Sequence, residues 1–250
     1  MSGHSKWAGI KHKKAIVDAQ KGKTFSKVVR EITVAAKQGG GHPDGNPRLR
    51  LAITKARDVN LPKDKIEQAI KKGTGELPGV SYEETLFEGY GPGGVAFLVE
   101  ALTDNKNRTA AEIRNIFTKR NGNLAGAGSV SWIFQRKGYI LVSVPATEEE
   151  RILSIALDHG AEDVTREGDG FAITTDVAHL EDVKQALAAA KIAVESAELT
   201  MLPQNAVRVE GSEASQVLAL VEALEDHDDV QHVYANFDIP DDILKAVAEG

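Results

Sequence analysis

The sequence contains no cysteine among its 250 residues, only two methionines, and 5% aromatic residues. Without cysteine the chain can form neither a disulfide nor a cysteine-ligated zinc site, and a reducing compartment suits it. It also lacks any apolar run long enough for a transmembrane helix or a signal-peptide core. A length of 250 residues favours two or three domains, and a hydrophobic content of 42% is ordinary for a globular protein, which we expect in the cytoplasm.

Sequence patterns of catalytic centres are missing as well. The seven histidines show no HExxH spacing, and no G-x-S-x-G nucleophile motif occurs. The glycine-rich segment EGYGPGG does not end in Lys-Ser/Thr and precedes an apolar run typical of a strand, so it favours a turn over a phosphate-binding loop. We therefore expect no enzymatic activity, no cofactor and no metal site.

The distribution of charge is uneven. The whole chain has a formal net charge of −7, yet residues 1–75 hold 17 Lys or Arg against 6 Asp or Glu. Residues 145–250 hold 6 basic against 24 acidic residues. Such asymmetry separates an end that faces a polyanion from one that faces solvent or protein partners.

The basic third predicts contact with nucleic acid. Lysine and arginine neutralise phosphates, and an indole ring can stack on an unpaired base. For Trp7 alone, packing in a helical core is favoured over stacking. Further lysines at positions 63, 65, 71 and 72 extend the basic field. The candidate nucleic-acid-binding residues are Lys6, Trp7, Lys11, His12, Lys13, Lys14, Lys21, Lys23, Lys27, Arg30, Arg48, Arg50, Lys55 and Arg57.

Hydrophobic periodicity predicts a small helical bundle followed by mixed helix and strand. Apolar residues recur at helical spacing in 24–38, 47–58 and 62–72, whereas residues 138–201 read as strand–helix–strand–strand–helix–strand. The preferred fold class is α+β, with a helical N-terminal domain and two ferredoxin-like α+β domains, one inserted into the other. The expected domains are 1–75, then 76–137 plus 204–250, with 138–203 inserted. Three sequential units are the alternative, but a lone βαβ unit would leave an open core.

Two polar segments have competing interpretations. LTDNKNRT, at residues 102–109, could hold an anion at a helix N-terminus, but Asp104 or Asn107 acting as a helix cap is favoured. LEDHDD, at residues 224–229, clusters four acids around His227 without the spacing of a calcium loop. A solvated turn is therefore favoured there over a cation site.

Four long segments carry a family resemblance over nearly the full chain. They are GHSKWAGIKHKKAIVDAQKGKTFSKVVREITVAAKQGG, NPRLRLAITKARDVNLPKDKIEQAIKKG, YEETLFEGYGPGGVAFLVEALTDNKNRT and LEDHDDVQHVYANFD. The chain resembles the YebC family through these segments and departs from it at His42, where the family more often has an acid. The resemblance implies one helical and two α+β domains in a cytoplasmic protein.

The resemblance also implies a function in gene expression, with two alternatives. The family is described as a group of probable DNA-binding transcriptional regulators. Its mitochondrial members are translational activators, and bacterial members have been linked to ribosomes stalled at proline runs. The mitochondrial members carry an extension before GHSKW, so a start on this motif fits a bacterial cytosolic form. The expected partner is nucleic acid, either DNA or ribosomal RNA, with the ribosome as a further candidate and no membrane. The basic leader suits RNA, because shape and backbone contacts need mainly cations.

Overall fold

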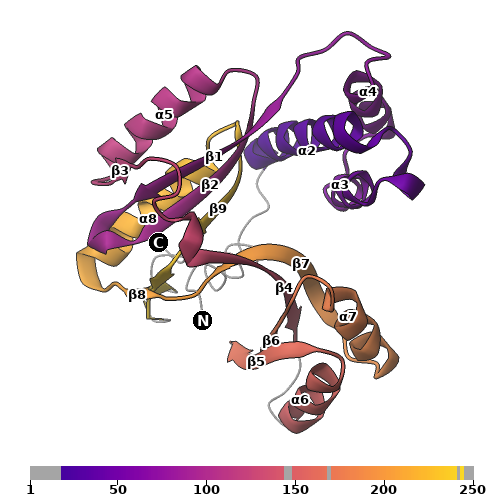
Figure 1. Ribbon diagram of the computed structural model, residues 1–250, viewed down its shortest axis with the longest axis vertical. Helices are drawn as coiled ribbons and strands as arrows, with labels where there is room; N and C mark the ends of the chain where they lie inside the picture. Colours follow the sequence, from indigo (N-terminus) through magenta and orange to yellow (C-terminus); the bar gives the residue numbers. More distant parts are fainter. Residues whose placement is uncertain (1–17, 144–147, 168–169, 241–242, 245–250) are drawn as a thin grey trace. The chain divides into compact units, whose positions relative to one another are not determined.

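A computed structural model describes residues 18–143, 148–167, 170–240 and 243–244, with side chains from residue 22 onward. The chain divides into two compact units (Figure 1). The smaller unit holds residues 132–208 and 236–238, and the larger holds the described residues before 132, those from 209 to 235, and those after 238. Among the described residues, each helix is too short or too polar to cross a bilayer.

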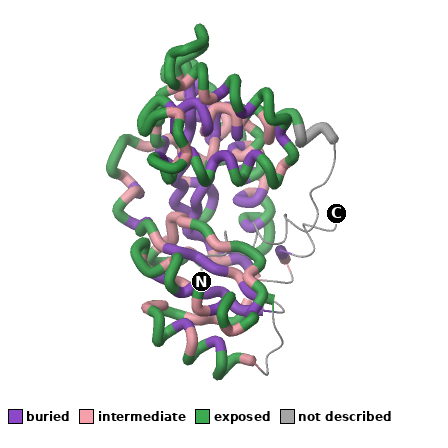
Figure 2. Tube along the Cα trace, turned by 90° about the vertical axis from the view of Figure 1, so that its right-hand side faces the viewer, coloured by how far each residue is buried: buried purple, intermediate pink, exposed green. Residues whose placement is uncertain are grey.

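The larger unit begins with the three predicted helices: α2 (Asp18–Gly39), α3 (Pro47–Asp58) and α4 (Lys63–Gly73). Buried and exposed positions alternate along each helix at helical spacing (Figure 2). The apolar stripe predicted for α2 is confirmed, since Val28, Ile32, Ala35 and Ala36 are buried in one core, which also contains Leu49 and Ile66.

Two local contacts fix how α2 meets the next two helices. The Asn46 side chain accepts a hydrogen bond from the amide of Leu49 at the start of α3, and its amide nitrogen donates to the carbonyls of Ala35 and Gly40. Gly73 ends α4 where any Cβ would lie 2.4 Å from the Thr33 carbonyl oxygen on α2. The two helices can approach this closely because residue 73 has no side chain.

The sheet of the larger unit has the order β3-β1-β2-β9. Its strands are β1 (Glu83–Tyr90), β2 (Ala96–Thr103), β3 (Asn123–Leu124) and β9 (Val230–Ala235). Helices α5 (Lys106–Lys119) and α8 (Gly211–Glu225) pack against each other and against this sheet (Figure 1). Phe117 of α5 meets Phe97 of β2 edge to face, with ring centroids 5.8 Å apart.

Three predictions for this unit need correction. The glycine and proline content of residues 73–94 predicts a linker, but β1 lies within this segment and pairs antiparallel with β2. The segment SVSWIFQ, residues 129–135, predicts a strand, but it contains a short 3₁₀ turn, Ser131–Ile133, which leads into β4 (Phe134–Val142) of the smaller unit. The cap of α5 is Asn105, whose side chain accepts from the amide of Arg108, in place of Asp104 or Asn107. The turn predicted for EGYGPGG is confirmed, and it includes the 3₁₀ segment Pro92–Gly94.

The smaller unit contains a sheet of order β5-β6-β4-β7. After β4 the chain forms α6 (Glu149–Asp158), β5 (Ala161–Glu167), β6 (Gly170–Thr175), α7 (Leu180–Ala189) and β7 (Val194–Pro203). This is the βαββαβ order predicted from the sequence, with a ferredoxin-like arrangement of antiparallel strands. Both helices bury apolar residues in a core shared with β4 and β6. A parallel pair, β8 (Val207–Arg208) and β10 (Phe237–Asp238), also belongs to this unit.

The predicted fold class, α+β with a helical N-terminal region followed by strand-containing parts, is confirmed. The sequence pattern predicts strand–helix–strand units at 95–135 and 205–237 that together complete one domain. The sheet of the larger unit differs in its strands, because β1 and β9 flank β2. The division into domains 1–75, 76–137 plus 204–250, and 138–203 stays a prediction.

Candidate nucleic-acid interface

Three predicted cations of α2 point to an acidic segment of their own unit. Lys23, Lys27 and Arg30 stand four and three residues apart, so they share one face of the helix. Lys23 forms an ion pair of 2.6 Å with Asp226, and Lys27 donates to the backbone carbonyl of Glu225 at 2.6 Å. Glu225 is the last residue of α8, and Asp226 follows it. Together with residues 227–229 they form what we call the acidic segment, residues 225–229.

Asp229 is the centre of this contact. Its side chain is 4% exposed and accepts from Arg30 at 2.7 Å, from Arg108 at 2.8 Å, and from the Thr109 hydroxyl at 2.6 Å. Burial opposes ionisation, but the hydrogen bonds from Thr109 and Arg108 and the charges of both arginines outweigh it. They hold the pKa of Asp229 below its ordinary value. The carboxylate therefore joins α2, α5 and the acidic segment.

The solvated turn predicted for LEDHDD is correct only for its exposed members. Asp226 and Asp228 are exposed, whereas Asp229 is buried and multiply bonded. Arg30 adds a bond to the backbone carbonyl of Asp228, and its guanidinium lies 5.4 Å from the ring centroid of Tyr82. The sequence showed the cluster of acids but gave no sign that one of them meets cations 121 and 199 residues away.

A cation site in the same place is disfavoured by these partners. Glu112, His227 and Asp229 each bring one potential metal-ligand atom, and these atoms lie within 4.8 Å of one another. Both oxygens of Asp229 already accept from guanidinium groups, and Nε2 of His227 lies 2.9 Å from Glu112. A metal ion would have to displace two arginines, so the arrangement is better suited to holding elements together.

Arg48 is a fourth predicted cation that is used internally. It forms ion pairs with Glu31 at 2.8 Å and with Glu84 of β1 at 2.5 Å, and it donates to Gln38. Burial opposes its charge, but the hydrogen bonds and charges of both glutamates raise the pKa of Arg48. Its charge is thus committed to joining α3 to α2 and β1.

The remaining predicted cations of α3 have a different environment. Arg50, Lys55 and Arg57 are exposed, and none of them has an acidic partner within ion-pair distance among the described residues. On α4, Lys65, Lys71 and Lys72 are likewise exposed. These six residues of α3 and α4 form what we call the outer basic set.

The other predicted residues lie outside the described part of the chain. They are Lys6, Trp7, Lys11, His12, Lys13 and Lys14, together with the side chain of Lys21. Their proposed contact with nucleic acid stays a prediction. Sequence reasoning missed Asp229 as the internal partner of Arg30, and Arg108 and Thr109 as further donors to that carboxylate, because these residues come from segments distant in the chain.

Fold and site together define a class: a two-unit α+β protein whose basic helical region, among the described residues, uses part of its charge internally and exposes the outer basic set. A family model described as the TACO1/YebC protein N-terminal domain matches residues 5–76. A second, described as the TACO1/YebC second and third domain, matches residues 82–237. The chain belongs to the TACO1/YebC family.

Individual relatives support this membership over their full length. A probable transcriptional regulatory protein of Desulforapulum autotrophicum is 56% identical over 99% of this chain and 100% of its own. Another, from Geobacter sulfurreducens, is 57% identical over 96% of each chain. The crystal structure of a conserved hypothetical protein from Aquifex aeolicus is similar with a TM-score of 0.79 and 50% identity, covering 92% of this chain and 95% of that one.

Proposed function

We propose that this protein is a nucleic-acid-binding regulator of gene expression that acts by binding and not by catalysis. The observation that carries the proposal is the outer basic set, whose cations are exposed while Arg30 of α2 and Arg48 of α3 are internally paired. The names of the relatives, which are probable transcriptional regulatory proteins, support the regulatory part.

The outer basic set suits contact with a phosphate backbone. Arg50 and Arg57 are seven residues apart on α3, two helical turns, so both side chains can reach one strand of phosphates. Thr54, between them, donates its hydroxyl to the Arg50 carbonyl of its own helix. Cations that have no neighbouring amide side chains contact phosphates without reading base edges. Such contacts give affinity and position the protein on the nucleic-acid backbone.

DNA and RNA remain two versions of the proposal. The relatives' names favour DNA and transcription. The absence of asparagine and glutamine from the described residues of α3 favours backbone recognition, and RNA bound by shape needs no more than that. A ribosome-associated translation factor in the cytoplasm, acting on ribosomes stalled at proline runs, is therefore the second candidate.

The test compares two exposed arginine pairs. Arg50→Ala/Arg57→Ala should remove two phosphate contacts and lower the slope of log affinity against log salt by about 2, with binding to both duplex DNA and structured RNA weakened. The control is Arg114→Ala/Arg166→Ala, two exposed arginines outside the helical region. Both double variants should keep the wild-type melting temperature. An unchanged slope in the first variant would refute the proposed interface.

The same proteins distinguish the two versions. Co-sedimentation with ribosomes from a nuclease-treated lysate, together with DNA binding that ignores sequence, would establish the translation candidate. Sequence-preferring binding to promoter fragments without ribosome association would establish transcription. Loss of either activity in Arg50→Ala/Arg57→Ala identifies the surface that the activity uses.

A further inference from the structure

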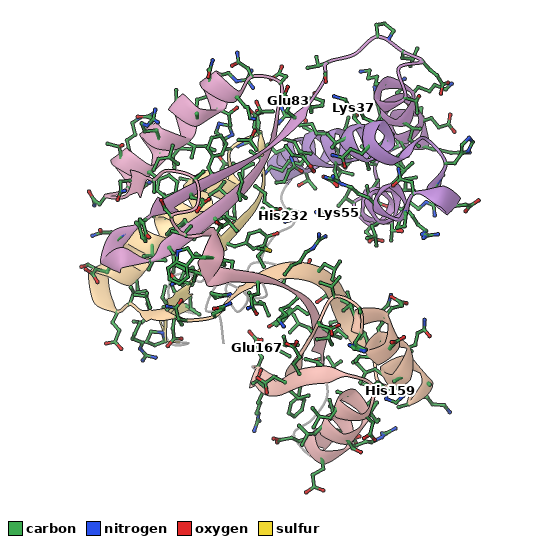
Figure 3. All side chains as sticks on the ribbon, in the orientation of Figure 1. Lys37, Lys55, Glu83, His159, Glu167 and His232 are labelled. Carbon is green, nitrogen blue, oxygen red and sulfur yellow. The ribbon has the colours of Figure 1, made fainter. Side chains whose placement is uncertain are left out.

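A small cavity lies between α2, α3 and β9 in the larger unit. Its volume is about 100 Å³, and its polar lining comes from Thr24, Lys27, Glu31, Lys55, Gln231 and His232. Figure 3 labels Lys55 on α3 and His232 on β9, which approach the cavity from opposite elements. A cavity of this size is far below the roughly 300–1,000 Å³ of sites for whole small molecules, so it suits one small group.

Two hydrogen-bond donors of this cavity have no acceptor among the described residues. Nε2 of Gln231 is buried and makes no hydrogen bond there, and such an amide is unfavourable until a ligand accepts from it. Lys55 contributes an ammonium group that no described carboxylate pairs. Thr24 also lines the cavity.

The charge balance of the cavity also favours an anion. Among the described residues its lining has one carboxylate, Glu31, which accepts from Arg48 at 2.8 and 3.3 Å, and the two lining lysines exceed it in charge. Burial, together with the charge of Lys55, outweighs the nearby acids Glu225, Asp226 and Asp228 and lowers the pKa of Lys27 to about 8. The Lys27 ammonium thus lies in a place where additional negative charge would stabilise it.

We propose that this cavity is an oxyanion site that binds a single phosphate group through Lys27, Lys55 and Gln231. A tetrahedral oxyanion offers several acceptors at once, which matches the two ammonium groups and the amide that line the cavity from α2, α3 and β9. The Lys27 ammonium has three N–H donors and gives one to the Glu225 carbonyl. Its source is either a phosphate of the nucleic-acid backbone, which rests on the proposed function, or free phosphate. In the first case the cavity extends the outer basic set, since Lys55 belongs to both.

The site is tested on the full chain with inorganic phosphate as the probe. Isothermal titration calorimetry at low salt should give one saturable binding event. Lys27→Met and Gln231→Leu should each weaken it about 10- to 100-fold, the effect of losing one charged or buried hydrogen bond. Lys55→Met, at an exposed position that the fold tolerates, should also weaken it. Lys119→Met on α5, equal in charge change but outside both the lining and the outer basic set, should not.

The outcomes separate this site from the proposed function. Wild-type protein without a saturable phosphate signal, or equal affinity in Lys119→Met and Lys55→Met, overturns the oxyanion site whatever the protein does with nucleic acid. If phosphate binds and Lys27→Met also lowers the salt slope of nucleic-acid binding by about 1, the ligand is a backbone phosphate. If phosphate binds while nucleic-acid affinity is unchanged in Lys27→Met, the site takes free phosphate.

Discussion

Two sets of cations in the helical region carry the same charge and have opposite environments. The first set, which we call the inner set, consists of Lys23, Lys27 and Arg30 of α2 and contacts the acidic segment, residues 225–229. The outer basic set of α3 and α4 is exposed, and its α3 members have no acidic partner among the described residues. The difference teaches that net charge predicts a polyanion-facing domain but not which of its cations face the polyanion.

The physical reason lies in burial. A cation that leaves water needs a partner of opposite charge, and such partners come from the fold. A cation on an outer helix face stays hydrated and can exchange its counterions for phosphate. Nucleic-acid binding should therefore depend on Arg50 and Arg57, and stability should depend on Arg30 and its carboxylate partner, Asp229.

Among changes to the contacts of the inner set, we expect Asp229→Ala to cause the largest loss of stability. It leaves Arg30, Arg108 and Thr109 without their shared acceptor. We expect the free energy of unfolding to fall by about 3 kcal/mol, the lower end of the range for broken buried pairs, because Arg108 keeps contact with water. Urea denaturation measures this loss directly.

The control for that variant is its neighbour. Asp228→Ala removes the same charge from an exposed position, and the backbone carbonyl that accepts from Arg30 remains. It should cost less than about 1 kcal/mol. Equal losses in the two variants would show that the segment contributes only general negative charge.

Glu88 contrasts with Asp229, because it is a buried carboxylate that backbone amides, rather than cations, stabilise. It accepts from the backbone amides of Gly128 at 2.7 Å, Val130 at 2.7 Å and Ser131 at 2.8 Å. Burial opposes its ionisation, but these three bonds outweigh burial and lower the pKa of Glu88. We expect Glu88→Gln to reduce the free energy of unfolding at pH 7 by about 2 kcal/mol, because the amide cannot accept from all three donors.

The pH dependence of this loss follows from the direction of the shift. Since the pKa of Glu88 is lower in the folded state, its contribution is complete above the unfolded value of about 4.3 and disappears as the pH falls through the folded value. Wild type and Glu88→Gln should therefore converge in acid. Denaturation curves between pH 7 and pH 3 test this, and a constant difference across that range would contradict it.

The sequence predicted features that neighbouring residues determine, and it missed contacts between segments that are distant along the chain. Helices α2–α4 and the βαββαβ order of the smaller unit follow from periodicity, which neighbouring residues carry. The strand β1 was missed because glycines and prolines flank it on both sides and only its second half is buried. The partners of Asp229 could not be found, since Arg30, Arg108 and Asp229 come together only after folding.

We expect the smallest effect from the ion pair between Lys23, the exposed member of the inner set, and Asp226. The two atoms lie 2.6 Å apart, but the side chains are 45% and 69% exposed, so water and salt compete with the pair. A double-mutant cycle with Lys23→Ala and Asp226→Ala should give a coupling energy below about 1 kcal/mol that decreases with added salt. A coupling as large as the Asp229 effect would mean that burial does not distinguish the contacts of α2. A small, salt-sensitive coupling would mean that Arg30 provides the main stabilising contact of α2. Lys23 could then exchange Asp226 for a phosphate.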